Sequence, residues 1–386
     1  KTGIDVLQFS DFKEIAGKKI ILFTNSSARN QNGELSAEIL IKSPNIQIVS
    51  IITPEHGFYA SASAGEKVAN EHLFGIPVYS LYSEIRKPNS KIISEGDIIL
   101  VDIQDIGVRS YTYISTLFKI MQAAAENNKA IYILDRPNPL GGENIDGAVL
   151  EKGMESFVGI VPIPYIHSLT IGELAYMINE ESWLNEGINR NFKCELNIIK
   201  MQGYERKMIW EDTGLMWFPA SPNVPNINSV RGLAMIGIFG ELGIISIGIG
   251  TTTPFQLIGS PNFDWEKVNK FYNNSSCISI SKTRYTPQFA MYSQKQINGI
   301  FLNFNNCYEF KPFSEGIKLF LAIRSVYPEL FNSNNIKDNS KSMFQKVTGT
   351  NNLFNAFFNN ISSENILKIA QNGLDDFMKL RSKYLL

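Results

Sequence analysis

The fold is decided by Ile98-Ile99-Leu100-Val101-Asp102-Ile103, a short, mostly β-branched apolar run that carries a charged residue near its end. Such a run is typical of a strand buried on both faces. Runs of the same kind occupy residues 19–25, 46–52 and 130–134. Between two of them, residues 113–127 carry apolar side chains at the i, i+3, i+4, i+7 spacing of an amphipathic helix. Alternating buried strands and helices predict a parallel α/β sheet covered on both faces.

The chain is long enough for more than one domain. Its 386 residues suggest two or three units at about 150 residues each. From residue 273 the composition shifts toward Asn, Ser and aromatic residues, so we place a domain boundary there, with domains at 1–272 and 273–386. Residues 350–386 predict two terminal helices.

Charge and cysteine usage exclude several classes of protein. The 36 Lys and Arg against 37 Asp and Glu give a net charge of −1, which disfavours sequence-independent nucleic-acid binding. No run of about 18 apolar residues predicts a membrane span. Cys194, Cys277 and Cys307 are far apart and form no CxxC, which disfavours a zinc cluster and a disulfide framework. Cys277 and Cys307 could still pair, leaving Cys194 over.

Polar residues follow four of the predicted strands where each one ends. They are Asn25, the Glu55-His56 pair, the stretch from Asp102 to Asp105, and the stretch from Asp135 to Asn138. Ligands of parallel sheets bind beyond the carboxyl ends of the strands, so we expect these residues to line one cleft. The alternative is that they only terminate strands and cap helices.

Glu55 is the candidate general acid. It follows a predicted strand and lies near Phe58 and Tyr59, whose apolar rings would disfavour the ionised carboxylate and raise its pKa. The neighbouring His56 could instead favour the charged form. The alternative is a loop glutamate that binds backbone amides.

The stretch from Asp102 to Tyr113 holds the densest group of polar side chains. Asp102 and Gln104 would share one side of an extended chain, and Asp105 and Arg109 could pair. Such a pair could serve a ligand or could only fix the loop.

Further binding candidates are aromatic or lie in a rigid turn. Tyr111 and Tyr113 offer flat surfaces suited to sugar rings. Asp135, Arg136 and Asn138 lie in a turn stiffened by two prolines. Arg109 and Arg136 could bind a substrate carboxylate through a bidentate fork.

Recognisable cofactor and metal motifs are absent from the sequence. There is no GxGxxG in a strand–turn–helix setting, no P-loop and no GxSxG elbow. His167 precedes a helix start at Thr170, where Glu173 completes a capping box. The three histidines form no HExxH, so no metal site is predicted, although magnesium held by carboxylates alone stays open.

Several long motifs carry a family resemblance. They are Pro54-Glu55-His56-Gly57-Phe58, Asp102-Ile103-Gln104-Asp105-Ile106-Gly107-Val108-Arg109-Ser110-Tyr111-Thr112-Tyr113, Leu134-Asp135-Arg136-Pro137-Asn138-Pro139, Thr170-Ile171-Gly172-Glu173-Leu174 and Ser221-Pro222-Asn223-Val224-Pro225. With them the chain resembles the exo-β-N-acetylmuramidase family over nearly its whole length.

The resemblance implies a fold, a reaction and a site. The fold is a Rossmann-like parallel-sheet domain with a second, smaller C-terminal α/β domain and the active cleft between them. The reaction is release of N-acetylmuramic acid from the non-reducing end of peptidoglycan fragments, with Glu55 as the leading catalytic residue and no NAD or other cofactor.

The second catalytic group is left open by the sequence. Asp102, Asp105, Asp135, Glu241 and the substrate's own N-acetyl group are candidates, and we name Asp105 beside Glu55. The expected substrate-binding residues are Asn25, His56, Asp102, Gln104, Arg109, Tyr111, Tyr113, Asp135, Arg136, Asn138, His167, Asn223 and Glu241.

One departure from the family pattern concerns the substrate. Ile249 stands where an arginine is common in the family, and Ser168 follows His167 where a glycine is common. If that arginine holds the lactyl carboxylate, this chain's substrate differs. A binding protein without turnover and a glycosidase for another β-linked amino sugar are therefore the alternatives.

The expected partner is a peptidoglycan-derived saccharide, with no nucleic acid and no membrane-spanning segment. A homodimer is compatible with the sequence. Because the substrate lies outside the cytoplasm, we expect a periplasmic or secreted protein, with cytoplasmic recycling as the alternative. The chain carries no signal peptide, which says nothing about a precursor.

Overall fold

A seven-stranded sheet forms the centre of the first part of the molecule, in the order β3-β4-β2-β1-β5-β6-β9. The computed structural model describes residues 1–185, 192–273, 275–359 and 361–386. The strands are β1 (Lys19–Thr24), β2 (Gln47–Thr53), β3 (Glu71–Leu73), β4 (Ile76–Ser80), β5 (Ile98–Asp102), β6 (Ala130–Leu134) and β9 (Leu196–Ile199). All neighbours pair in parallel except β3, which lies antiparallel to β4 at the edge. The predicted parallel sheet is confirmed.

Helices cover both faces of this sheet. They are α1 (Gly3–Phe9), α2 (Ser36–Lys42), α3 (Ser90–Ile93), α4 (Tyr113–Glu126) and α5 (Ile171–Glu180), with the short 3-10 helices η1 (Trp183–Asn185) and η2 (Trp210–Thr213). Side chains alternate along β1: Ile20 and Leu22 pack in one core cluster with α1 and α2, whereas Ile21 and Phe23 pack in another with α4. The sheet is therefore buried on both sides, as its continuous apolar strands predict.

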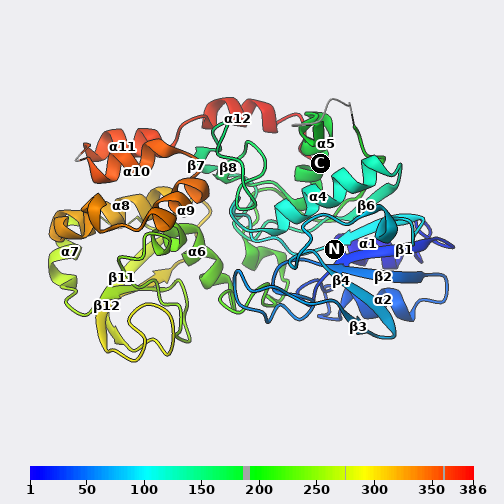
Figure 1. Cartoon of the computed structure of the whole chain (residues 1–386), viewed down its shortest axis with the longest axis horizontal. Helices are drawn as coiled ribbons and strands as arrows, with labels where there is room; N and C mark the ends of the chain where they lie inside the picture. Colours follow the sequence, from blue (N-terminus) through cyan, green and yellow to red (C-terminus); the bar gives the residue numbers. More distant parts are fainter. Residues whose placement is uncertain (186–191, 274, 360) are drawn as a thin grey trace.

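The second part of the molecule has its own three-stranded antiparallel sheet, in the order β10-β12-β11. Its strands are β10 (Leu257–Ser260), β11 (Ile278–Tyr285) and β12 (Ile297–Phe304). The helices around it are α6 (Ile227–Gly240), α7 (Trp265–Phe271), α8 (Pro312–Val326), η3 (Pro328–Phe331), η4 (Ser333–Asn335), α9 (Asp338–Thr348), α10 (Asn351–Phe358), α11 (Ser363–Ala370) and α12 (Leu374–Arg381). Figure 1 shows the two parts side by side, with the red helix α12 running between them. The two-part α/β fold is confirmed.

The chain boundaries of these parts differ in detail from expectation. The division after residue 272 stays a prediction, although β10 before it pairs with β12 after it. The expected two helices after residue 350 are wrong, since α10, α11 and α12 are three. Gly373, with φ of +81°, separates α11 from α12 in the left-handed conformation that glycine tolerates.

Two smaller features complete the description of the fold. The hairpin-like pair β7 (Asp146–Val149) and β8 (Pro164–Ile166) lies apart from both larger sheets. The capping box at the start of α5 is confirmed: Thr170 Oγ1 accepts from the Glu173 amide at 3.2 Å, and Glu173 Oε2 accepts from the Thr170 amide at 2.9 Å. No helix in the described ranges is long and apolar enough to cross a membrane.

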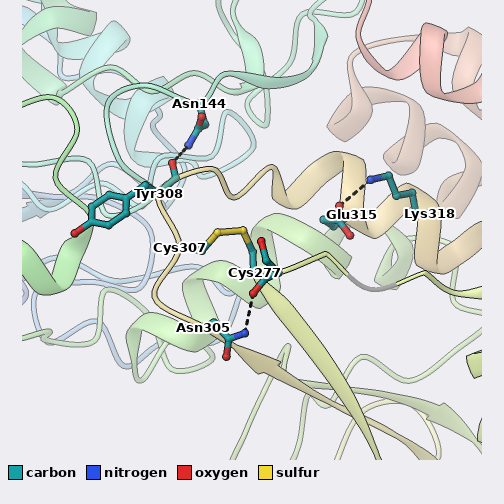
Figure 2. The surroundings of a disulfide bond; sticks show 8 residues. Asn144, Cys277, Asn305, Cys307, Tyr308, Glu315 and Lys318 are labelled. Carbon is teal, nitrogen blue, oxygen red and sulfur yellow. Dashed lines mark hydrogen bonds and ion pairs between the residues drawn. A yellow bond between two sulfur atoms is a disulfide. The ribbon is translucent and has the colours of Figure 1, made fainter.

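A disulfide links the start of β11 to the end of β12 in the second part. Cys277, just before β11, is bonded to Cys307, which follows β12 (Figure 2). This is the pairing that the sequence left open. Nearby, the Asn305 side chain donates to the Ser276 carbonyl at 2.8 Å, and the Asn144 side chain donates to the Tyr308 carbonyl. The third cysteine, Cys194, is buried and unbridged.

Candidate active site

A cavity of about 580 Å³ lies between the two parts of the molecule. The first part contributes the loops after β2 and β5, which carry Glu55 and Tyr111. The second part contributes the end of α6 with Glu241, the following loop with Ile249, and Met343 of α9. The cavity is thus at the carboxyl edge of the parallel sheet, where ligands of such sheets bind.

Glu55 is held in place on this cavity by two hydrogen bonds. Its Oε1 accepts from the Gly65 amide at 2.8 Å, and its Oε2 accepts from the Thr112 hydroxyl at 2.6 Å. The side chain is only 6% exposed. Thr112 can donate to the carboxylate and accept from the carboxylic acid, so this contact survives a change of proton occupancy.

His56 lies next to Glu55 in a strained backbone conformation, with φ of +73°. Its Nδ1 donates to the Ala62 carbonyl at 2.7 Å, which fixes the Nδ1-protonated tautomer of the neutral ring. The same hydrogen bond holds the loop between Glu55 and Gly65 closed. His56 therefore both lines the cavity and shapes the loop that carries Glu55.

Two tyrosines that line the cavity lie near Glu55. Burial and the charge of Glu55 raise the pKa of Tyr82, and the nearby Arg86 opposes this shift. Burial also raises the pKa of Tyr111, whose hydroxyl is buried without a hydrogen-bond partner. Both phenols stay protonated at neutral pH and can donate to a ligand.

Glu241 is the second carboxylate on the cavity. It follows the last residue of α6, and burial raises its pKa. Among the described residues that line the cavity, Glu55 and Glu241 are the carboxylates, and none is a lysine or arginine. The lining also has an apolar portion that includes Ile245, Ile247 and Ile249.

The structure brings together five of the residues predicted from sequence: Glu55, His56, Tyr111, Asn223 and Glu241 all line the cavity. The others predicted beside them are buried but do not line it. They are Asn25, Asp102, Gln104, Asp105, Arg109, Tyr113, Asp135, Arg136, Asn138 and His167.

Asp102 and Arg136 form a buried ion pair. Arg136 Nε donates to Asp102 Oδ1 at 2.5 Å and its Nη2 donates to Oδ2 at 2.9 Å, while Nη1 donates to the Arg29 carbonyl at 2.8 Å. Because the guanidinium fork is filled by the protein's own carboxylate, Arg136 has no free fork for a substrate carboxylate.

Arg109 is also held by the protein's own carbonyls, and its Nε is buried without a hydrogen-bond partner. Its Nη1 donates to the Ala148 and Ile163 carbonyls, each at 2.7 Å, and its Nη2 donates to the Val347 carbonyl at 3.0 Å. Burial lowers the pKa of Arg109 to about 10, which still leaves it charged at neutral pH. The expected pairing with Asp105 is not formed.

Asp105 instead faces His167. Asp105 Oδ2 accepts from the Gly107 amide at 2.7 Å and lies 3.7 Å from His167 Nε2. His167 Nδ1 accepts from the Leu169 amide at 3.2 Å, which places the proton of the neutral ring on Nε2, toward Asp105. Asp105 Oδ1 and His167 Nε2 are both buried without a hydrogen-bond partner.

Further predicted residues hold strand ends and a helix start. Asn25 donates to the Tyr113 hydroxyl at 2.7 Å, and Asn138 donates to the Leu169 carbonyl at 3.0 Å. Gln104 donates to the Pro137 carbonyl at 3.1 Å. Asp135 accepts from the Gly172 amide at 2.8 Å at the start of α5, and burial raises its pKa to about 7.

Sequence reasoning missed Tyr82 and the role of Thr112. Tyr82 follows β4, a strand with a proline that the apolar-run criterion does not find. Thr112 stands inside a quoted motif, and its hydroxyl could have been recognised as a partner for a nearby carboxylate. No group of three or more His, Cys, Asp or Glu side chains in the described ranges could hold a metal ion.

Known proteins match the chain along its whole length. The models of exo-β-N-acetylmuramidase NamZ match residues 20–228 for the N-terminal part and 232–386 for the C-terminal part. The peptidoglycan β-N-acetylmuramidase NamZ of Bacillus subtilis (strain 168) is 35% identical over 390 residues, covering 100% of this chain and 91% of that protein.

Two solved structures from Bacteroides fragilis NCTC 9343, both DUF1343 family proteins, share the fold. One is 35% identical with a TM-score of 0.90, and the other is 27% identical with a TM-score of 0.77. Each alignment covers 100% of this chain and 98% of the solved one. Matches to both family models and to a relative of this similarity show that the chain belongs to the exo-β-N-acetylmuramidase family.

Proposed function

We propose that this protein releases N-acetylmuramic acid from the non-reducing ends of peptidoglycan fragments, with Glu55 as the general acid. As a member of its family the chain is a glycoside hydrolase. The observation that supports the acid role is the position of Glu55. It is a buried carboxyl on the cavity between the two parts, fixed through Gly65 and Thr112.

Hydrolysis needs a proton for the leaving oxygen and a nucleophile at the anomeric carbon. In our proposal Glu55 gives its proton to the glycosidic oxygen as the bond from that oxygen to the anomeric carbon breaks. Thr112 keeps the resulting carboxylate in place by donating to it. A water molecule adds to the anomeric carbon and loses a proton.

Glu241 is the group that we assign to this water. Of the four carboxylates that the sequence left open for the second role, Glu241 lines the cavity, whereas Asp102, Asp105 and Asp135 do not. Burial raises the pKa of Glu241, which makes its carboxylate a stronger base toward water.

Substitution of Glu55 by Gln tests the acid role. We expect kcat on a chromogenic β-N-acetylmuraminide to fall about 10²- to 10⁴-fold, because general acid catalysis contributes that much. The matched control is Glu66→Gln, the same change at an exposed carboxylate of the same loop, which accepts only from the Ser63 amide. Unchanged turnover in Glu55→Gln would remove Glu55 as the acid, and no turnover by the folded native protein would contradict the proposed function.

We further propose that the protein works outside the cytoplasm, in the periplasm or after secretion. The disulfide between Cys277 and Cys307 supports this, because structural disulfides persist mainly in oxidising compartments. The homodimer stays a prediction.

A further inference from the structure

The proposed substrate carries a carboxylate that the cavity must recognise. N-acetylmuramic acid bears a lactyl carboxylate on the same ring whose glycosidic bond is cleaved. The described lining residues include Glu55 and Glu241 but no lysine or arginine, so the lining alone would repel this charge. Arg109 and Arg136, the cations that the sequence favoured, donate to the protein's own carbonyls and to Asp102.

Arg86 is a cation of a different kind. Its guanidinium carbon lies 3.5 Å from the ring centroid of Tyr82 and 4.8 Å from that of Phe157. Stacking on aromatic faces fixes a guanidinium without using its N–H donors. Its Nη1 is buried without a hydrogen-bond partner among the described residues.

The rings that hold Arg86 belong to the wall of the cavity. Tyr82 itself lines the cavity, and so does Val158, the residue after Phe157. The pKa of Tyr82 is raised by burial and by the charge of Glu55, and Arg86 opposes this shift, which places the phenol next to both groups. Tyr82 is therefore the side chain that lies between Arg86 and Glu55, the proposed general acid.

We propose that Arg86 is the residue that binds the lactyl carboxylate of the terminal sugar, through the guanidinium edge that the protein leaves unpaired. This assignment rests on the proposed function. The two aromatic rings hold the fork in a fixed direction, so little side-chain entropy is lost when the carboxylate binds. The positive charge also offsets the repulsion between the substrate carboxylate and the carboxylate of Glu241.

Two substrates that differ in one charge test this assignment. The first is a chromogenic β-N-acetylmuraminide, and the second is the same compound with its lactyl carboxylate converted to a methyl amide. We expect the native protein to prefer the acid, and Arg86→Gln to lower kcat/KM for the acid by about 10- to 100-fold, the range for a hydrogen-bonded charge pair. The amide should change less than twofold, so the preference disappears.

Control variants separate recognition from structure. Lys67→Gln removes one positive charge from an exposed residue that pairs with Glu84, and it should leave both substrates unchanged. Arg86→Lys keeps the charge but loses the planar fork, and it should retain part of the preference.

The remaining outcomes are decisive as well. An equal loss on both substrates in Arg86→Gln would show that Arg86 only supports Tyr82, and an unchanged preference for the acid would place the carboxylate elsewhere; either result overturns the proposal. If the native protein cleaves neither substrate, the proposed function fails. Calorimetric binding of N-acetylmuramic acid to the native protein and to Arg86→Gln then still tests Arg86, because equal affinities would overturn the assignment.

Discussion

Charged side chains at the carboxyl edge of the sheet have two different roles: some line the cavity, and others form buried ion pairs within the protein. Glu55, after β2, lines the cavity, whereas Asp102, at the end of β5, does not line it and pairs with Arg136. The Asp102 side chain is fully buried and that of Arg136 is 4% exposed. The pair links the end of β5 to the loop after β6, and Arg136 also donates to the carbonyl of Arg29.

Removing one partner of this pair destabilises the folded protein, because it leaves the other charge buried and unpaired. We expect Asp102→Asn to lower the free energy of unfolding by about 3–5 kcal/mol. Chemical denaturation measures this. As a control, Glu38→Gln breaks the exposed pair with Lys42 and should leave the denaturation midpoint where it is. A midpoint for Asp102→Asn equal to that of the native protein would show that the pair contributes nothing.

Sequence predicted the edge at which the site lies better than it predicted which side chains reach it. The residue type at a strand end does not reveal whether the side chain lines the cavity, as Glu55 does, or pairs within the protein, as Asp102 does. Arg109 illustrates the limit: its hydrogen-bond acceptors at Ala148, Ile163 and Val347 are backbone carbonyls far away in sequence. Carbonyls carry no signature of residue type, so only the fold shows that Arg109 donates to them.

Among the helices, α6 and α8 make the closest approach that glycine permits. A Cβ atom at Gly316 of α8 would lie 1.8 Å from the Met235 carbonyl oxygen of α6. The aromatic rings of Phe239 and Phe320 stack at 3.7 Å between the same helices. Because α6 ends at the cavity with Glu241, this packing sets the position of the proposed base.

Alanine at Gly316 should therefore force the two helices apart. We expect Gly316→Ala to lower the unfolding free energy by about 2 kcal/mol or more, as overpacking of a core does, and to reduce kcat. The matched control is Gly237→Ala in α6, where an added Cβ meets the Leu233 side chain at 3.4 Å and the Tyr165 hydroxyl at 3.8 Å, both at ordinary contact distance. That change should be neutral or stabilising, because alanine favours a helix over glycine by about 1 kcal/mol. Thermal unfolding of both variants tests this explanation, and equal melting temperatures would contradict it.

Helix α6 is also an element that the sequence does not predict. Residues 227–240 are mostly apolar after Arg231 and include three glycines, so they lack the clear 3.6-residue periodicity that revealed α4. Such a pattern fits a helix buried all round, but glycine spacing argues against a helix on propensity alone. Packing against α8 overrides that propensity, and packing is not visible in a local window.

Across the whole molecule, Arg109 joins three segments. The side chain comes from the loop between β5 and α4. It donates to Ala148 in β7, to Ile163 before β8, and to Val347 near the end of α9. Val347 also lines the cavity. One guanidinium thus connects the sheet of the first part to a helix of the second at the margin of the site.

Loss of this connection should affect both stability and substrate binding. In Arg109→Met three buried carbonyls lose a donor, so we expect the unfolding free energy to fall by roughly 3 kcal/mol or more. We also expect KM to rise, because α9 is released next to the cavity. Denaturation and steady-state kinetics measure the two effects. Arg284→Met, which removes an exposed arginine bonded to Asn298, should change neither. An unaltered KM in a destabilised Arg109→Met would confine Arg109 to a role in folding.

The return of α12 to the first part has a mechanical consequence. The chain crosses between the parts before α6 and crosses back after α11, where the Tyr384 hydroxyl donates to Glu181 and the Leu386 amide donates to Glu173 at 3.1 Å. A body attached at one point can swing in any direction, whereas each further attachment removes some of that freedom. The contacts made beyond α12 therefore restrict how far Glu241 and Glu55 can move apart when a glycan end enters.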